Sequence, residues 1–431
     1  MAQRLDFTKP GFEERFRALI GMKREAAEDI EAVVATILHE VAERGDEALI
    51  DYTLRFDRCT LSAATLRVTD TEIEAAVAAC PREALDALAF ARARIEAFHL
   101  RQRPKDDHFT DALGVRLGLR WTPIEAVGLY VPGGTASYPS SVLMNAVPAK
   151  VAGVQRIVMV APTPENRHNP LVLAAAKLAG VDEIYRIGGA QAVAALAFGT
   201  ASIAPVAKIV GPGNAYVAAA KRRVFGLVGI DSIAGPSEVL VLADKTANPD
   251  WVALDLLAQA EHDAAAQSIL ITDDAALAEA VEKRIALNLA ELPRAAIARA
   301  SWRDFGAVIL VPTLPDAAGL VDRLAPEHLE IATEEPEKLA GLIRNAGAIF
   351  LGHYTPEAIG DYVGGPNHVL PTARTARFSS GLGVTDFMKR TTLLDATRAG
   401  LSALAPAAVA LAEAEGFDAH ARSVSARLNR G

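Results

Sequence analysis

The expected fold rests on a stretch that reads KIVGPGNAYVAAAKRRV from Lys208 to Val224. Lys208–Val210 has the composition of a short strand, Gly211-Pro212-Gly213 is typical of a turn, and Ala215–Val224 has the composition of a helix. The same order recurs earlier, after strands expected at Ala126–Val131, Arg156–Ala161 and Glu183–Ile187. Repeated strand–turn–helix units predict a parallel sheet with helices on both faces.

A second series of the same kind follows Gly235-Pro236. Its expected strands are Glu238–Ala243, Gln267–Thr272, Ala307–Val311, Leu329–Ala332 and Ala348–Leu351. Residues 11–103 have the apolar spacing of helices, and the chain ends in two Ala-rich helical stretches. We therefore expect the α/β class, with two Rossmann-like domains built on parallel sheets. Their expected order is an N-terminal helical segment (1–125) that leads into and packs with the second α/β domain, a first α/β domain (126–236), a second α/β domain (237–380) and a C-terminal helical tail (381–431).

Composition excludes several classes of function. The 431 residues carry a net charge of -9, which argues against a nucleic-acid-binding surface. Only Cys59 and Cys80 are present, so a disulfide framework or a thiolate zinc site is not expected, and any metal must be held by His, Asp, Glu or an amide. Met1–Pro10 lacks the apolar region of a signal peptide, and no apolar run is long enough to span a membrane, so a cytoplasmic protein is expected.

The first pattern that could form a functional site lies at the end of the helix expected at Trp251–Glu261. Gln259 and His262 are three residues apart, so both side chains project from one face of that helix. An amide oxygen and an imidazole in this arrangement suit a divalent metal. Taken alone, however, such a pair is more often an ordinary helix surface.

Glu327 and His328 form the second pattern, at the mouth of an expected strand. A carboxylate and an imidazole can act as acid and base near neutral pH. Neighbours on a strand point to opposite faces, so both reach one pocket only if the backbone turns there, as the preceding Pro326 allows. A solvated turn is the alternative reading.

Two further patterns pair an acid with a histidine. Asp361 and His368 flank a Gly-rich loop whose backbone could approach a ligand closely, although a polar turn has the same composition. Glu415 and His420 lie in the helical tail, where a lone histidine is usually structural or solvated.

Glycine-rich turns are the other recurring feature. Gly211-Pro212-Gly213-Asn214 follows an expected strand and precedes a helix, whose first N–H groups suit an anion such as a pyrophosphate. Gly188-Gly189 is similar, but neither turn has the G-x-G-x-x-G pattern, and both also suit ordinary tight α/β turns.

Taken together, these patterns resemble the histidinol dehydrogenase family over about the whole chain. The resemblance is carried, in the family's order and at similar spacing, by Asp255–His262, Leu324–Leu329, Gly364–Thr372, Gly211–Asn214 and Gly235–Glu238. No single run is specific, but the combination is. It implies a zinc-dependent, NAD-linked oxidation of L-histidinol to L-histidine through L-histidinaldehyde, the last steps of histidine biosynthesis.

The resemblance also assigns roles to residues. It implies zinc ligands at Gln259, His262, Asp361 and His420, which agrees with the scarcity of cysteine. It makes His328 the base for the hydroxyl proton and Glu327 the group that activates water at the aldehyde stage. The residues expected at the substrate are Ser237, Gln259, His262, His328, Asp361, His368, Glu415 and His420.

For NAD, the resemblance implies contacts from Tyr130, Gln191 and Asn214, on loops after three strands of the first α/β domain. It further implies a homodimer whose C-terminal tail reaches the partner's active site, so that Glu415 and His420 act in trans.

Two alternatives stay open at this point. A zinc dehydrogenase of the same fold could act on another small alcohol, such as a sulfonated diol; it should lack Glu415 or His368, and this sequence has both. A non-catalytic two-domain binding protein would have no need for Glu327 and His328 beside four metal ligands.

Overall fold

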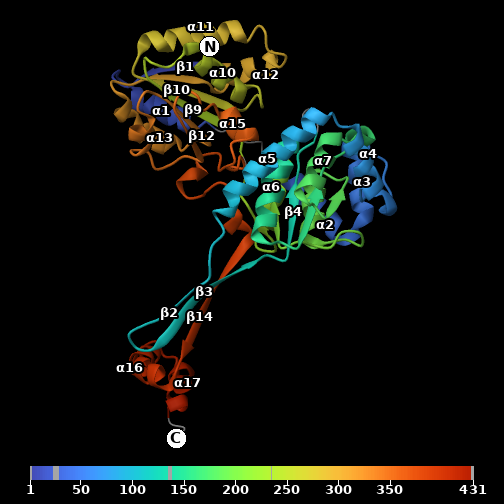
Figure 1. Cartoon of the computed structure of the whole chain (residues 1–431), viewed down its shortest axis with the longest axis vertical. Coiled ribbons are helices and arrows are strands. Elements are labelled where there is room, and N and C mark those ends of the chain that lie inside the picture. The colour runs from blue at the N-terminus through green and yellow to red at the C-terminus, as the bar shows by residue number, and fades with distance from the viewer. Residues whose placement is uncertain (1, 23–28, 134–137, 234, 429–431) are drawn as a thin grey trace.

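The computed structural model of the chain describes residues 2–22, 29–133, 138–233 and 235–428. Two α/β units lie at one end of the molecule, and a long arm leads from them to the C-terminal helices (Figure 1). The predicted α/β class with two parallel sheets is confirmed. Parts of the predicted helical segment (23–28), of the first α/β domain (134–137 and 234) and of the tail (429–431) lie outside the described residues.

The first sheet is parallel, with its strands in the order β6-β5-β4-β7-β8. The strands are β4 (Ala126–Tyr130), β5 (Arg156–Val160), β6 (Glu183–Tyr185), β7 (Lys208–Val210) and β8 (Gly229–Ile230). The helices that follow the first four are α6 (Pro139–Ala152), α7 (Pro170–Ala179), α8 (Gly189–Phe198) and α9 (Ala215–Val224). The direction of strand succession reverses between β4 and β7. Open parallel sheets bind ligands outside the carboxyl ends of their strands at such a point.

The second sheet is also parallel, in the order β1-β11-β10-β9-β12-β13. Its strands are β1 (Gln3–Asp6), β9 (Glu238–Ala243), β10 (Gln267–Thr272), β11 (Ala307–Leu310), β12 (His328–Ala332) and β13 (Ala348–Leu351). The helices between β9 and β13 are α10 (Pro249–Ala260), α11 (Ala275–Asn288), α12 (Ala295–Phe305), α13 (Ala318–Leu324) and α14 (Pro336–Ala340), and α15 (Glu357–Tyr362) follows β13. The edge strand β1 was not predicted, because its four residues lack the β-branched and aromatic side chains that mark a strand.

The N-terminal segment is divided between the two units. Helix α1 (Phe12–Ile20) packs with the second sheet through Phe16 and Leu19. The next four helices pack on the first unit instead: α2 (Asp29–Arg44), α3 (Asp46–Asp57), α4 (Asp70–Ala79) and α5 (Arg82–Leu100). Helix α8 is buried on all sides, so the first unit needs this second layer of helices to cover it. Packing of 1–125 with the second domain therefore holds for its first twenty residues or so and for contacts of α5 such as that of Arg94 with Gly364, whereas the apolar faces of α2 to α5 pack on the first unit.

The arm is a feature that the sequence did not reveal. Strands β2 (Asp107–Thr110), β3 (Val115–Pro123) and β14 (Met388–Ala396) form an antiparallel sheet in the order β14-β3-β2. The predicted tail helices follow as α16 (Arg398–Ala414) and α17 (Asp418–Leu428), at the tip of the arm (Figure 1). Leu394 and Leu411 are 70% and 64% exposed there. Because little of the arm packs on a core, its strands lack the alternation of buried and exposed residues that predicts a strand.

Among the described residues, no helix combines the length and apolar character needed to cross a bilayer. Cys59 and Cys80 are both free thiols, and no disulfide framework was expected from two cysteines.

A buried arginine attaches the N-terminal helices to the first unit and leads to a stability prediction. Arg186 donates from Nε to Nε2 of His168 at 2.8 Å and also binds the Thr65 carbonyl at 2.8 Å. Burial, and then the Arg186 charge, lower the pKa of His168 to about 4. The unfolded chain therefore binds a proton more readily than the folded one below pH 6.5, and stability is lost as the pH falls from 6.5 toward 4. Between pH 7 and pH 5 we expect the free energy of unfolding to fall by about 1–2 kcal/mol because of His168, and this contribution should be absent in His168→Gln.

Urea titrations of both proteins at the two pH values would test this, since their difference isolates His168 from the other histidines. An equal pH dependence in the two proteins would contradict it.

Candidate functional site

The predicted site residues of the second unit meet at the edge of its sheet where β9 and β12 begin. These two strands are paired neighbours, with His328 opposite Val239, and Ser237 precedes β9 directly. Helix α10 ends at the same edge and brings Gln259 there, with His262 just beyond. This is the amino edge of a parallel sheet, whereas ligands of open parallel sheets usually lie at the carboxyl edge. The site is therefore built on helix ends and strand starts.

His328 is held with one ring nitrogen bound and the other without a partner. Its Nδ1 lies 2.9 Å from the carbonyl oxygen of Glu238, to which it can donate a proton. Its Nε2 is buried and has no hydrogen-bond partner among the described residues. Burial lowers the pKa of His328 to about 3, which keeps the ring neutral. Nε2 can therefore carry a lone pair that is available to accept a proton.

Glu327 reaches the same place because the chain turns just before β12. Ala325 has the left-handed φ of 45°, next to the proline at which a turn was expected. The Glu327 Oε2 atom accepts the N–H of Glu238 at 3.0 Å and lies 3.8 Å from Nδ1 of His328. The two neighbouring side chains thus share one environment, as the predicted turn at Pro326 requires.

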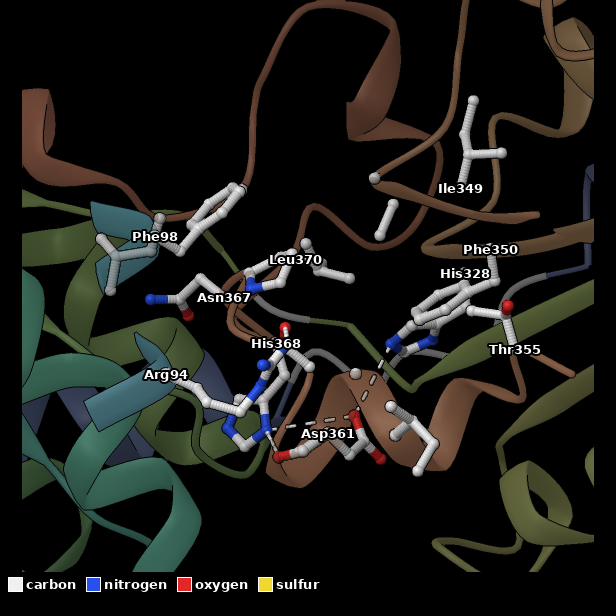
Figure 2. A pocket seen from close by; sticks show the side chains of 18 of the residues that line it. Arg94, Phe98, His328, Ile349, Phe350, Thr355, Asp361, Asn367, His368 and Leu370 are labelled. Carbon is white, nitrogen blue, oxygen red and sulfur yellow. Dashed lines mark hydrogen bonds and ion pairs between the residues drawn. The ribbon is translucent and has the colours of Figure 1, made fainter. Parts of the chain in front are cut away.

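Asp361 stands between two histidine rings (Figure 2). Its Oδ1 lies 4.0 Å from Nε2 of His328 and 3.9 Å from Nδ1 of His368. Burial raises the pKa of Asp361 to about 6, because removal from water disfavours the charged carboxylate. His368 is anchored by Nδ1 at 2.8 Å from the Asp361 carbonyl oxygen and by Nε2 at 3.2 Å from the Ser141 hydroxyl. Burial lowers the pKa of His368 to about 4, so it too is neutral.

Gln259 and His262 supply the donors that a metal would need. Gln259 is fully buried, and its Oε1 has no hydrogen-bond partner among the described residues. Burial lowers the pKa of His262, and His262 is near enough to lower the pKa of His328 and His368 in turn. Helix α10 packs against α15, which carries Asp361. A buried amide oxygen without a partner among the described residues, a neutral imidazole and a buried carboxylate together fit a divalent cation such as zinc.

Glu357 is a site residue that the sequence interpretation missed. It is 3% exposed, and its Oε1 lies 3.4 Å from Nδ1 of His328. Burial, and then the charge of Asp361, raise its pKa well above the usual value. Ligand atoms of His328, Glu357 and Asp361 lie within 4.8 Å of one another, so these three could also share a cation. The four-residue spacing of Glu357 and Asp361 on one helix was the available signal.

A cavity of about 550 Å³ opens beside these residues, lined by His328, Asp361 and His368 on one side. Phe98 and Arg94 of α5 line the other side (Figure 2). Arg94 donates to the carbonyl oxygens of Val363 at 2.6 Å and Gly364 at 2.9 Å, which fixes the end of α15. The cavity thus lies between the second unit and a helix packed on the first.

The residues expected to contact NAD lie at the carboxyl edge of the first sheet. Tyr130 ends β4, and its hydroxyl accepts the N–H of Gly189 at 3.0 Å. Gln191 is 1% exposed, and its buried Oε1 has no partner in the described part of the chain. Asn214 begins α9 by accepting the N–H groups of Tyr216 and Val217 at 3.1 and 3.2 Å. Tyr130 lies within β4 and Gln191 within α8, so of the three only Asn214 lies on a loop after a strand, as predicted.

Of the predicted site residues, the structure brings together in the second unit Ser237, Gln259, His262, Glu327, His328, Asp361 and His368. It does not bring Glu415 and His420 to them within one chain. Both are exposed at the tip of the arm, far from the α/β units (Figure 1). A second copy of the chain is therefore needed if these two residues are to complete the site.

Comparisons with known proteins show a family to which this chain is similar over nearly its whole length. A family model described as histidinol dehydrogenase matches residues 21–428. Histidinol dehydrogenases from Rhodopseudomonas palustris and Brucella suis are 69% and 64% identical to this chain, with the whole of each chain covered. The crystal structure of histidinol dehydrogenase from Elizabethkingia anophelis is 38% identical, covers 99% of this chain and 98% of its own, and superposes with a TM-score of 0.95.

Proposed function

The chain belongs to the histidinol dehydrogenase family, and from this membership we propose that it oxidises L-histidinol to L-histidine with two molecules of NAD. The first oxidation gives L-histidinaldehyde. Water then adds to the aldehyde, and a second oxidation gives the carboxylate. Each oxidation removes a hydride and a proton, so the site needs a base at the carbon that reacts and a group that activates water.

The observation that carries this proposal is the buried Nε2 of His328, a residue that lines the cavity, because this atom has no hydrogen-bond partner in the described part of the chain. His328 takes the hydroxyl proton at Nε2, while its Nδ1–H remains bound to the Glu238 carbonyl oxygen, which stabilises the imidazolium. Glu327 activates the water for the aldehyde stage. Its carboxylate is held by the N–H of Glu238, so it is oriented before the substrate arrives.

The proposed zinc ligands are Gln259, His262 and Asp361 of one subunit and His420 of the partner subunit. When bound, zinc would supply a Lewis acid that holds the substrate in place through both oxidations. His328 stays outside this ligand set, because a base must keep its lone pair free. Ser237, His368 and Glu415 of the partner subunit are the proposed substrate contacts, and the acid suits a cationic substrate.

NAD is proposed to bind at Tyr130, Gln191 and Asn214, with its reactive end toward the cavity. Ser141 supports this direction. It lies in the first turn of α6, directly after the loop that follows Tyr130, and its hydroxyl lies 3.2 Å from His368. The carboxyl edge of the first sheet and the amino edge of the second thus face a common space.

Metal content and NADH yield test the proposal together. We expect about one zinc per chain and two NADH per L-histidinol consumed, because both oxidations occur before the product leaves. Zinc is measured on the purified protein and NADH by absorbance with limiting substrate, with a sulfonated diol as the comparison substrate. One NADH per histidinol would show that the aldehyde escapes. Turnover of the diol in place of histidinol would assign the site to another alcohol.

A further inference from the structure

Lys221 and Asp231 form an ion pair inside the first unit, below the turn that follows β7. Their side chains are only 2% and 5% exposed. Lys221 comes from α9, and Asp231 directly follows β8. Two buried charges stabilise a fold little better than two apolar side chains of the same size. The pair therefore points to a purpose other than stability.

Both charged groups hold the backbone of one residue, Gly211. Lys221 donates from Nζ to the Gly211 carbonyl oxygen at 3.0 Å. Asp231 accepts the Gly211 N–H through Oδ2 at 2.7 Å, and its Oδ1 binds Lys221. Gly211 has a φ of +111°, and a Cβ at this position would collide with the carbonyl oxygen of Tyr130. The clamped residue thus lies directly against the end of β4, at the point where the sheet reverses.

We infer that the Lys221–Asp231 pair positions the Gly211–Asn214 turn for the cofactor, an inference that rests on the proposed use of NAD. Asn214 begins α9 three residues after Gly211, so a shift of the clamped peptide moves this helix start as well. The N-terminus of a helix favours an anion such as a pyrophosphate. Lys221 neutralises the carboxylate beneath the turn, which would otherwise repel that anion.

Lys221→Met tests the inference, since it removes the ammonium group and keeps the apolar stem. We expect the KM for NAD to rise about tenfold, while kcat at saturating NAD and the KM for histidinol change less than about twofold. The double variant Lys221→Met/Asp231→Asn removes both charges and keeps an oxygen for the Gly211 N–H. Its KM for NAD should fall between those of Lys221→Met and the wild type. Fluorescence titration with NADH gives the same order without turnover.

Arg156→Met is the matched control. Arg156 pairs with Glu183 at 2.7 Å at the starts of β5 and β6, the opposite edge of the same sheet, and both are mostly buried. This variant should lower the melting temperature and leave the KM for NAD unchanged.

An unchanged KM for NAD in Lys221→Met, or equal rises in the KM for NAD and for histidinol, would overturn the inference. If Lys221→Met does not fold, the double variant decides: a KM for NAD equal to that of the wild type contradicts a positioning role, and a raised value supports it. A wild-type protein that reduces no NAD would overturn the proposed function and this inference with it.

Discussion

Replacing His328 by asparagine should lower kcat by about a thousandfold, with the protein still folded and zinc-loaded. The asparagine amide occupies the position of Nδ1, so the hydrogen bond to the Glu238 carbonyl oxygen is kept. What disappears is the buried Nε2 of His328, which has no hydrogen-bond partner among the described residues. Because no other group replaces this base at the same point, the first oxidation loses its proton acceptor. Steady-state NADH formation with saturating histidinol and NAD measures the loss.

Glu327→Gln is the comparison that separates the two roles. It keeps an oxygen for the Glu238 N–H but cannot take a proton from water. We expect this variant to be impaired mainly when histidinaldehyde is the substrate, whereas His328→Asn is impaired mainly with histidinol. Zinc content and melting temperature of both variants should match the wild type. Equal losses on both substrates in both variants would show that the pair acts only as a unit.

The predictable part of the fold is the part in which side chains are buried in a regular pattern. Strands such as Glu238–Ala243 and Gln267–Thr272 were predicted with the bounds that the structure has, because every residue in them is buried. The exposed arm lacked this signal. Gln3–Asp6 was missed since its place at the edge of the sheet depends on pairing with β11, which lies three hundred residues away in the sequence.

The candidate site was predictable where its functional residues are close together in the sequence. Gln259 with His262, and Glu327 with His328, are local patterns, and the structure places them at one sheet edge. Glu357 was missed because a single glutamate at a helix start is common on surfaces. Its place in the site follows from an exposed fraction of only 3% and from its distance to His328, and sequence spacing gives neither quantity.

The C-terminal tail carries the two predicted site residues that one chain does not bring to the rest of the site. Glu415 and His420 are exposed at the tip of an arm that carries apolar side chains such as Leu394 and Phe417 on its surface. Three of the four proposed zinc ligands lie in the body of the protein, so the fourth, His420, could join them only from another copy of the chain. Exposed apolar residues of this kind are typical of a surface that another protein covers.

Mixing two inactive variants, His262→Asn and His420→Asn, should restore about a quarter of the wild-type activity if the tail acts in trans. Alone, each variant lacks one proposed ligand in every site. We therefore expect each to lose zinc and its kcat to fall by at least about a hundredfold. After subunit exchange, about half of the dimers contain one chain of each kind. In such a dimer, one site has both defects, and the other has an intact body and an intact tail from its partner. A tail that acted within its own chain would leave every site in the mixture defective, and the mixture would stay as inactive as its components. Mixing His262→Asn with Asp361→Asn is the control: both ligands belong to the body, so no exchange of subunits can produce a complete site.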